Sequence, residues 1–406
     1  MNVKLFFHNY GIILTVKAMK VLGLVLELNP LHNGHQYFID QAKQKVNPDL
    51  TVAVISTNFT MRGDISVIDK FTKTKLALAS GIDVVLELPF LSAVNSADYF
   101  GYNALKILTD FGITDLAFGV EIADYEKLTK MKTIIDSDSF NEQIKKHLSL
   151  GLSYSTSAFK ALSSQITDQE IINNFTLPNN TLGIQYLRAI DTLKKDIKVT
   201  LIKRIDNNFF DQQLTGSISS ATAIRKHLEA NDDISAYVPN HQLKVNYIKS
   251  RDAEEHLLTI LKHQYTIHHP SYFQNILGVS EGIENRIANF IFQANSYQEL
   301  IYNIQTKRYP INKIKRLLLH IILNTNKDYE GKHLNYLRLL GANDNGLSYL
   351  NQLPKEIKNI VITSFKKNDN DLVLKELQAT KLYGIITKQN DLYLEEFKIP
   401  ILGGKQ

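Results

Sequence analysis

Two histidines, His32 and His35, have the type and spacing needed for chemistry on a phosphate. They flank Asn33 and Gly34, and they follow an apolar run that ends at Leu28. A spacing of three places both imidazoles on one side of a first helical turn, and a glycine lets a nucleotide approach the backbone closely. Two imidazoles beside a triphosphate can donate hydrogen bonds to an α-phosphate that gains charge in a transition state. The alternative is a polar helix cap with two solvent-facing histidines.

A second polar group opens a predicted helix within Ser217 to Lys226. Ser219 or Ser220 can cap that helix, and Arg225 with Lys226 can reach β- and γ-phosphates and stabilise departing pyrophosphate. Alone, a serine-rich cap before an amphipathic helix is more often structural than catalytic. Its pairing with the two histidines favours phosphate binding.

The elements that must position these residues alternate between strands and helices. Short apolar runs, typical of parallel strands buried on both faces, cover residues 21–28, 51–56, 83–88, 115–119 and 199–204. Helical patterns lie between them, from near His35, over 73–79, over 97–111 and over most of 121–175. This order predicts an α/β fold with a Rossmann-like, doubly wound parallel sheet, which holds ligands at the carboxyl ends of its strands.

The pattern changes after about residue 240. Helical spacing dominates residues 253–263, 284–293 and 311–323, and a small strand pair is expected at 382–386 and 392–397. A chain of 406 residues is long enough for two domains. We therefore predict an N-terminal extension over residues 1–18, a catalytic domain over 19–240 and a mostly α-helical domain over 241–406.

Composition limits the possible chemistry and partners. The chain has no cysteine, which excludes disulfides, thiolate nucleophiles and cysteine-bound metals. The net charge of +5 is uneven: residues 241–406 hold 22 of the 46 basic and 16 of the 41 acidic residues, a balance of +6, which leaves −1 for the rest. No apolar run reaches the roughly 20 residues of a membrane helix, so we expect a cytoplasmic protein without a membrane partner.

A basic segment in the second domain is a candidate RNA-binding surface. Five of its ten residues are basic and none is acidic, namely Lys307, Arg308, Lys313, Lys315 and Arg316. Such a segment, beside Tyr309, can follow an RNA backbone. The alternative is a solvated helix face. Four further residues, Lys20, Arg62, Asp64 and Lys73, lie where loops should converge, without an assignable role.

The two motifs together resemble those of the nucleotidylyltransferase superfamily, in which His-x-Gly-His follows the first strand and Ile-Ser-Ser-Thr-x-Ile-Arg comes later. Ala221 stands where the second pattern usually has threonine. Further segments are similar to successive blocks of the bacterial tRNA-Met cytidine acetate ligase family, namely residues 23–35, 58–64, 81–89, 118–121, 177–183, 202–205 and 337–341. The resemblance runs from about Met19 nearly to the end.

That resemblance implies an enzyme that forms acetyl-adenylate from acetate and ATP and acetylates the wobble cytidine of elongator tRNA-Met. It implies ATP as a cofactor and His32, His35 and Arg225 as catalytic residues. In-line attack on the α-phosphate also requires charge neutralisation, for which we expect Mg²⁺, with no assigned metal ligand. Of Asn179 and Asn180, the first is slightly favoured and both are kept. The ATP-binding residues it implies are Val25, Glu27, Asn29, Pro30, His32, Asn33, Gly34, His35, Phe38, Gly119, Asn179, Asn180, Arg204, Ser219 and Ser220.

Two alternatives stay open. A nucleotidylyltransferase acting on a small phosphorylated cofactor precursor would not need the large basic domain. A noncatalytic RNA-binding protein on a decayed nucleotide fold would not need the intact His32, Gly34, His35 and Arg225.

Overall fold

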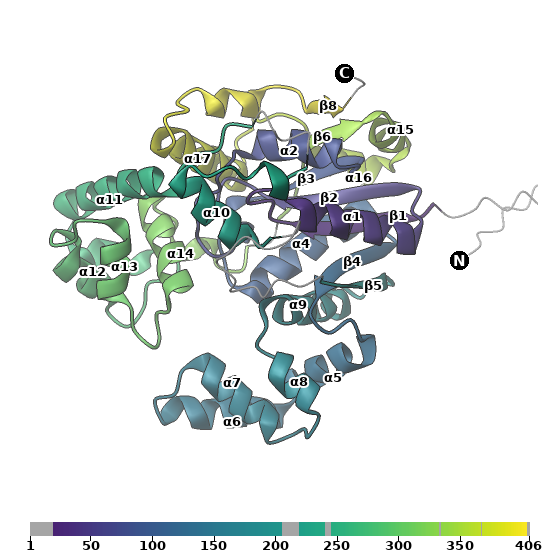
Figure 1. Ribbon diagram of the computed structural model, residues 1–406. Coiled ribbons are helices and arrows are strands. Elements are labelled where there is room, and N and C mark those ends of the chain that lie inside the picture. Colours follow the sequence, from purple (N-terminus) through teal and green to yellow (C-terminus); the bar gives the residue numbers. More distant parts are fainter. Residues whose placement is uncertain (1–18, 205–218, 240–244, 333, 367, 404–406) are drawn as a thin grey trace, which may run out of the picture.

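The computed structural model describes residues 19–204, 219–239, 245–332, 334–366 and 368–403 (Figure 1). The predicted extension over residues 1–18 lies outside the described residues, as do Ser217 and Ile218 of the second motif. A central sheet has helices on both faces and two helical lobes beside it. In the described ranges, no helix has the length and apolar character needed to span a bilayer.

The centre of the sheet is parallel and doubly wound, as predicted. Its strands lie in the order β5-β4-β1-β2-β3. They are β1 (Val21–Leu26), β2 (Leu50–Ser56), β3 (Val84–Leu88), β4 (Asp115–Val120) and β5 (Lys198–Lys203). The chain order reverses between β1 and β4, and at such a switch point the carboxyl ends of adjacent strands leave a crevice for a ligand.

One edge of the sheet comes from the C-terminal part of the chain. β6 pairs antiparallel with β3, and β7 and β8 each pair parallel with β6. These strands are β6 (Leu337–Asn343), β7 (Val361–Ile362) and β8 (Ile401–Gly403). Apolar spacing identifies a strand but neither its direction nor its neighbour, so the antiparallel edge was not predicted. The sheet thus crosses residue 240, and the division into domains there stays a prediction.

Hydrophobic clusters cover both faces of the sheet, which explains the continuous apolar runs of its strands. Along β2, Val54 packs into one cluster and the next residue, Ile55, into the other. The helices that contribute to the two clusters are α4 (Ala97–Phe111) and α9 (Pro178–Leu193) on one face, and α1 (Asn33–Val46) and α2 (Lys70–Ala79) on the other.

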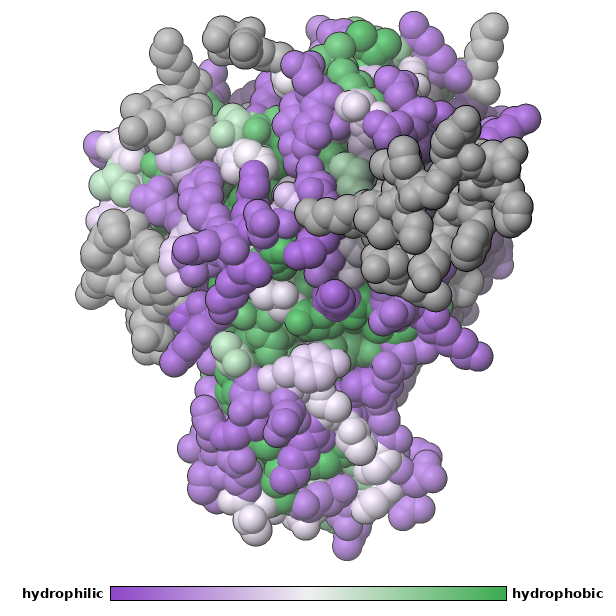
Figure 2. Space-filling model, turned by 90° about the vertical axis from the view of Figure 1, so that its right-hand side faces the viewer, coloured by the Kyte–Doolittle hydropathy of each residue, from purple (hydrophilic) through white to green (hydrophobic). Residues whose placement is uncertain are grey.

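Two helical lobes extend from the sheet, as their helical patterns predicted. The lower lobe in Figure 1 contains α5 (Tyr125–Ile135), α6 (Asp138–Ser149), α7 (Tyr154–Ser163) and α8 (Gln169–Asn174). Figure 2 shows it as the narrower part of the molecule, with apolar surface gathered near its junction with the body. The lobe at the left of Figure 1 contains α11 (Ser250–Ile267), α12 (Ile283–Ile291), α13 (Tyr297–Ile304) and α14 (Ile311–Ile322).

The strand pair predicted at 382–386 and 392–397 is wrong. The first segment ends the helix α17 (Asp371–Ile386), and the second is the 3₁₀ helix η5 (Leu392–Phe397). α17 buries residues such as Val373, Leu382 and Tyr383 on several sides. A short apolar run in a buried helix cannot be told from a strand by its periodicity alone.

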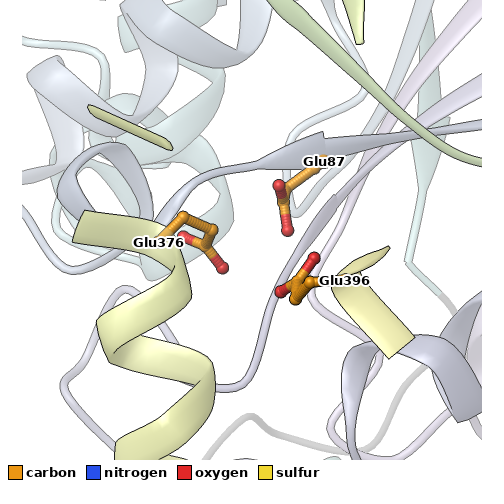
Figure 3. A group of neighbouring side chains, drawn as sticks. All are labelled: Glu87, Glu376 and Glu396. Atoms are coloured by element: carbon orange, nitrogen blue, oxygen red, sulfur yellow. The ribbon is translucent and has the colours of Figure 1, made fainter. Parts of the chain in front are cut away.

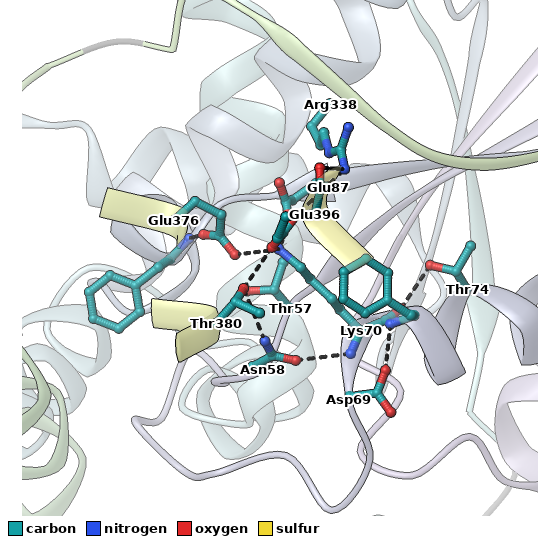
Figure 4. A network of polar contacts seen from close by, with 12 residues as sticks. Thr57, Asn58, Asp69, Lys70, Thr74, Glu87, Arg338, Glu376, Thr380 and Glu396 are labelled. Atoms are coloured by element: carbon teal, nitrogen blue, oxygen red, sulfur yellow. Dashed lines mark hydrogen bonds and ion pairs between the residues drawn. The ribbon is translucent and has the colours of Figure 1, made fainter. Parts of the chain in front are cut away.

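A buried ion network fastens α17 and η5 to the sheet. Figure 3 shows Glu87 of β3, Glu376 of α17 and Glu396 of η5 pointing toward one another. Lys70, at the start of α2, lies among them (Figure 4): its Nζ atom is 2.9 Å from Glu376 and 2.5 Å from Glu396, and it also contacts Glu87. Arg338 of β6 lies 3.4 Å from Glu396. These carboxylates could group around a metal ion, but the Lys70 ammonium already serves as their cation.

Candidate active site

The two histidines cap the helix that follows β1. His32 is the N-cap residue of α1, which begins at Asn33, slightly before the predicted start near His35. The Gly34 N–H donates to His32 Nδ1 at 3.1 Å, and the His32 N–H donates to His35 Nδ1 at 3.3 Å. Because both Nδ1 atoms accept, each ring carries its hydrogen on Nε2. The pair thus offers two Nε2–H donors on rings whose centres lie 3.9 Å apart.

Both histidines line a cavity of about 250 Å³ at the carboxyl ends of β1, β4 and β5. Pro30, Asn33 and Asn180 lie outside its lining: Pro30 is buried, and Asn33 Nδ2 donates to the Ala236 carbonyl at 2.9 Å. The structure brings together the other predicted nucleotide and catalytic residues, which are Val25, Glu27, Asn29, His32, Gly34, His35, Phe38, Gly119, Asn179, Arg204, Ser219, Ser220 and Arg225.

The neighbouring asparagines have different roles. Asn180 is fully buried, and its Oδ1 accepts hydrogen bonds from the Glu121 and Ile122 N–H groups at 3.0 and 3.2 Å. Asn179 lines the cavity, and its Oδ1 accepts from Arg204 Nη1 at 3.4 Å. Asn180 therefore holds the backbone after β4, while Asn179 is placed to meet a ligand.

The second motif meets the first one at the cavity. Ser220 is the N-cap of α10 (Ala221–Ala230), where its Oγ accepts from the Ala223 N–H at 3.1 Å. Ser219 is buried, and its Oγ has no hydrogen-bond partner among the described residues. Arg225 Nη1 donates to the Asn29 carbonyl at 2.8 Å. This bond joins the helix of the second motif to the loop that carries the histidines.

Gly119, at the end of β4, lines the cavity next to Phe38 and Arg204. A Cβ atom at this position would lie 3.7 Å from Arg204 Cγ and 3.9 Å from the Phe38 ring. A Cβ atom would thus be in ordinary van der Waals contact with the Phe38 ring and with the aliphatic stem of Arg204. The Phe38 ring and the Arg204 guanidinium group can both stack on a nucleobase.

The Thr60–Asp64 loop is the largest part of the site that sequence reasoning did not assign. Arg62 and Asp64, which were expected near converging loops, line the cavity together with Thr60 and Met61. Glu27 Oε1 accepts from the Met61 N–H at 2.8 Å, which ties the loop to the end of β1. The family-like block over residues 58–64 was the signal that could have pointed to these residues.

The five basic residues of 307–316 do not form one solvated face. Lys307 and Arg308 are exposed in the turn before α14, and Lys313 Nζ lies 4.0 Å above the centre of the Tyr309 ring. Lys315 Nζ instead lies 2.8 Å from Asp64, and Arg316 Nη1 donates to the Met61 carbonyl at 3.1 Å. At these two positions both side chains turn to the cavity loop, and RNA binding by the segment stays a prediction.

Burial keeps both histidines neutral. Together with the charges of Arg204 and Lys73, it lowers the pKa of His35 to about 3. Burial, with His35, Arg204 and Arg225, also lowers the pKa of His32 well below its usual value. A neutral imidazole still donates a hydrogen bond from Nε2–H, so both rings can stabilise a phosphate oxygen without being protonated to the cationic form.

The depressed pKa of His35 predicts its behaviour in a pH titration. We expect its ring NMR signals to stay constant between about pH 8 and pH 5, with the hydrogen on Nε2, while the denatured chain titrates near pH 6.5. Since the folded pKa lies below the unfolded one, the stability linked to His35 is complete above about pH 6.5 and is lost as the pH falls toward about 3. A folded-state titration near pH 6.5 would contradict this assignment.

The fold and the site define a nucleotidyltransferase. At the switch point of a doubly wound sheet, His32 and His35 lie at the start of a helix, and Arg225 is bonded to the loop that carries them. A family model described as HIGH Nucleotidyl Transferase matches residues 19–396. The chain belongs to this family and, within it, to the tRNA(Met) cytidine acetate ligases. The resemblance seen in the sequence is thereby confirmed.

The relatives match nearly end to end. The tRNA(Met) cytidine acetate ligase of Oceanobacillus iheyensis is 36% identical over 404 residues, covering 95% of this chain and 100% of the relative. That of Thermosipho africanus is 36% identical over 359 residues, or 85% of each chain. The crystal structure of Thermotoga maritima TmcAL in its apo form has a TM-score of 0.84 and 29% identity, and covers 95% of this chain and 99% of that one. A second Thermotoga maritima structure, bound with α-thio ATP, has a TM-score of 0.82 and 28% identity.

Proposed function

We propose that this protein activates acetate with ATP and transfers the acetyl group to the wobble cytidine of elongator tRNA-Met, giving N4-acetylcytidine. The observation that carries the proposal is the meeting of His32, His35 and Arg225 at one cavity, in a chain 36% identical to a tRNA(Met) cytidine acetate ligase. A cytoplasmic location goes with this substrate.

The cavity suits ATP in one orientation. The N-terminus of α1 and the two Nε2–H donors favour binding of the triphosphate beside them. The Arg225 guanidinium can stabilise the negative charge of the pyrophosphate that leaves. The part of the cavity lining formed by Phe38, Gly119 and Arg204 suits the adenine ring. The α-thio ATP bound to Thermotoga maritima TmcAL supports a nucleotide in this cavity.

Two displacements make up the proposed reaction. An acetate oxygen attacks the α-phosphorus, the bond to the bridging β-oxygen breaks, and pyrophosphate leaves with acetyl-adenylate formed. The cytidine N4 amine then attacks the acetyl carbon, loses a proton and displaces AMP. His32 and His35 stabilise charge on the α-phosphate, so the first step needs positioning and electrostatics but no covalent enzyme intermediate.

Magnesium is a further part of the proposal. Glu27 and Asp64 are carboxylates in the cavity lining, and Mg²⁺ prefers such oxygens together with substrate phosphates. Either residue would hold the ion, which would neutralise phosphate charge when bound. Asp64 is suited to remain ionised, because Lys315, Arg225 and Arg62 outweigh the effect of burial and lower its pKa.

Incubation with ATP, radiolabelled acetate and bulk tRNA tests the function. Label in tRNA is expected. An absence of label despite ATP binding would overturn the proposal. In that case, adenylation of a small phosphorylated acceptor would favour the nucleotidylyltransferase that acts on a cofactor precursor. Binding of tRNA without any adenylation would favour the noncatalytic RNA-binding protein.

The tRNA surface is proposed to include the turn before α14. Lys307 and Arg308 are exposed there, and Lys313 lies in the first turn of the helix. A cytidine must leave the anticodon stack to reach the cavity. We expect Lys307→Gln, Arg308→Gln and Lys313→Gln each to weaken tRNA binding. Each should also reduce the slope of the logarithm of the binding constant against the logarithm of the salt concentration by about 1. Filter binding over a salt series measures this, and unchanged affinity and slope in all three would remove the turn from the interface.

A further inference from the structure

One wall of the cavity is held from outside by the helix α14. Lys315 Nζ and Asp64 Oδ1 lie 2.8 Å apart, and their side chains are only 14% and 23% exposed. Arg316 Nη1 donates to the Met61 carbonyl at 3.1 Å. Two neighbouring cations of one helix thus contact both halves of the Thr60–Asp64 loop.

The helix and the loop also approach each other closely through their backbones. Gly63 has a positive φ of +79°, which favours glycine. A Cβ atom at Gly63 would lie 2.6 Å from the Arg316 nitrogen and 2.7 Å from the Lys315 carbonyl carbon. Since backbone atoms cannot rotate away, even one methyl group would push the loop and the helix apart.

The Thr60–Asp64 loop is a tight turn closed by its own backbone hydrogen bonds. The Thr60 N–H donates to the Asp64 carbonyl at 3.0 Å, and the Gly63 N–H donates to the Thr60 carbonyl at 2.9 Å. On its inner side the loop is bonded to Glu27 of the cavity through the Met61 N–H. The contacts with α14 therefore set where the whole turn lies relative to the cavity.

The loop lines the cavity together with Arg225, the residue proposed to bind the departing pyrophosphate. Burial lowers the pKa of Arg225, and the charges of Asp64 and Arg62 act on the same guanidinium, the first raising and the second lowering its pKa. Arg225 is also the residue that is bonded to the histidine-bearing loop through Asn29. A shift of the Thr60–Asp64 loop would therefore move charged groups beside the reacting phosphate.

We propose that Lys315 and Arg316 are positioning residues for acetyl-adenylate formation, which they support by fixing the Thr60–Asp64 loop, and not phosphate ligands of RNA. This inference rests on the proposed function, since it assigns two residues of the basic segment to the first half-reaction. The same helix then carries the proposed RNA contact Lys313 at its start and the loop contacts one turn later.

The test is acetate-dependent ATP–pyrophosphate exchange in the absence of tRNA. Lys315→Gln and Arg316→Gln are each expected to lower kcat at least about tenfold, because small misplacements of catalytic groups are costly. Lys315→Arg, which keeps a cation for Asp64, is expected to recover most of the rate. Lys106→Gln is the matched control, because Lys106 pairs with Asp110 at similar exposure on α4 and contacts none of these groups; it should leave exchange unchanged.

Gly63→Ala tests the same contact from the loop side and removes no charge. It should lower exchange as Lys315→Gln does, so the inference stays testable if one glutamine variant fails to fold. Exchange at the wild-type rate in Lys315→Gln and Arg316→Gln, with tRNA affinity reduced, would overturn the inference and make both residues RNA ligands. A wild-type protein without acetate-dependent exchange would instead overturn the proposed function itself.

Discussion

His35→Ala is expected to reduce acetyl-adenylate formation by about 10²- to 10³-fold while tRNA binding stays nearly intact. The substitution removes one Nε2–H donor from the cavity, and a single donor to developing charge is typically worth that factor. Acetate-dependent pyrophosphate exchange measures the first quantity and filter binding the second. Equal loss of both would contradict the separation of ATP and tRNA sites.

A conservative variant separates chemistry from helix capping. His35 Nδ1 accepts the His32 N–H, so alanine also removes part of the cap, at a cost of about 0.5–2 kcal/mol of stability. His35→Asn keeps an acceptor near the place of Nδ1 but has no group at the place of Nε2. It should unfold like the wild type and still lack activity; restored activity would show that the cap was the residue's main contribution.

Lys70→Met is expected to destabilise the protein by about 3–5 kcal/mol, because it leaves carboxylates buried without their shared cation. Glu87, Glu376 and Glu396 all contact Lys70 Nζ, and all four side chains are buried. Arg338, which lies 3.4 Å from Glu396, would remain as a cation near the network. Urea unfolding, followed by circular dichroism, measures the loss.

Two further variants decide whether charge causes that loss. Lys398→Met breaks an exposed pair with Glu395, in which Lys398 is 62% exposed, and should cost less than about 1 kcal/mol. Adding Glu376→Gln and Glu396→Gln to Lys70→Met should recover part of the stability by removing unpaired charge. If Lys70→Met costs no more than Lys398→Met, the network is not a major source of stability.

The parallel sheet could be predicted from the sequence because strands that are buried on both faces need apolar residues at successive positions. Val54 and Ile55 of β2 are an example, since they pack into hydrophobic clusters on opposite faces. The sequence could not predict β6 beside β3, since strand pairing depends on residues far apart in the chain. The 382–397 segment failed for a different reason: buried helix and buried strand share the same short apolar pattern.

In the site too, features set by local sequence could be predicted and features set by the tertiary fold could not. His32 and His35 were identifiable because a local turn brings them together. The roles of Asn179 and Asn180 were not, because only the fold turns one side chain to the cavity and buries the other. Similarly, a run of basic residues does not reveal that Lys315 has its acidic partner 251 positions earlier, at Asp64.

The antiparallel edge has a consequence for how the enzyme is made on the ribosome. β6, α17, η5 and β8 all come from residues after 336. Yet β6 and β8 complete the sheet, and α17 and η5 supply two of the three carboxylates around Lys70, Glu376 and Glu396. A nascent chain that has already produced both phosphate-binding motifs still lacks this edge, and Lys70 has only Glu87 to neutralise it. The sheet can therefore be finished only near the end of synthesis, after β6 and β8 have left the ribosome.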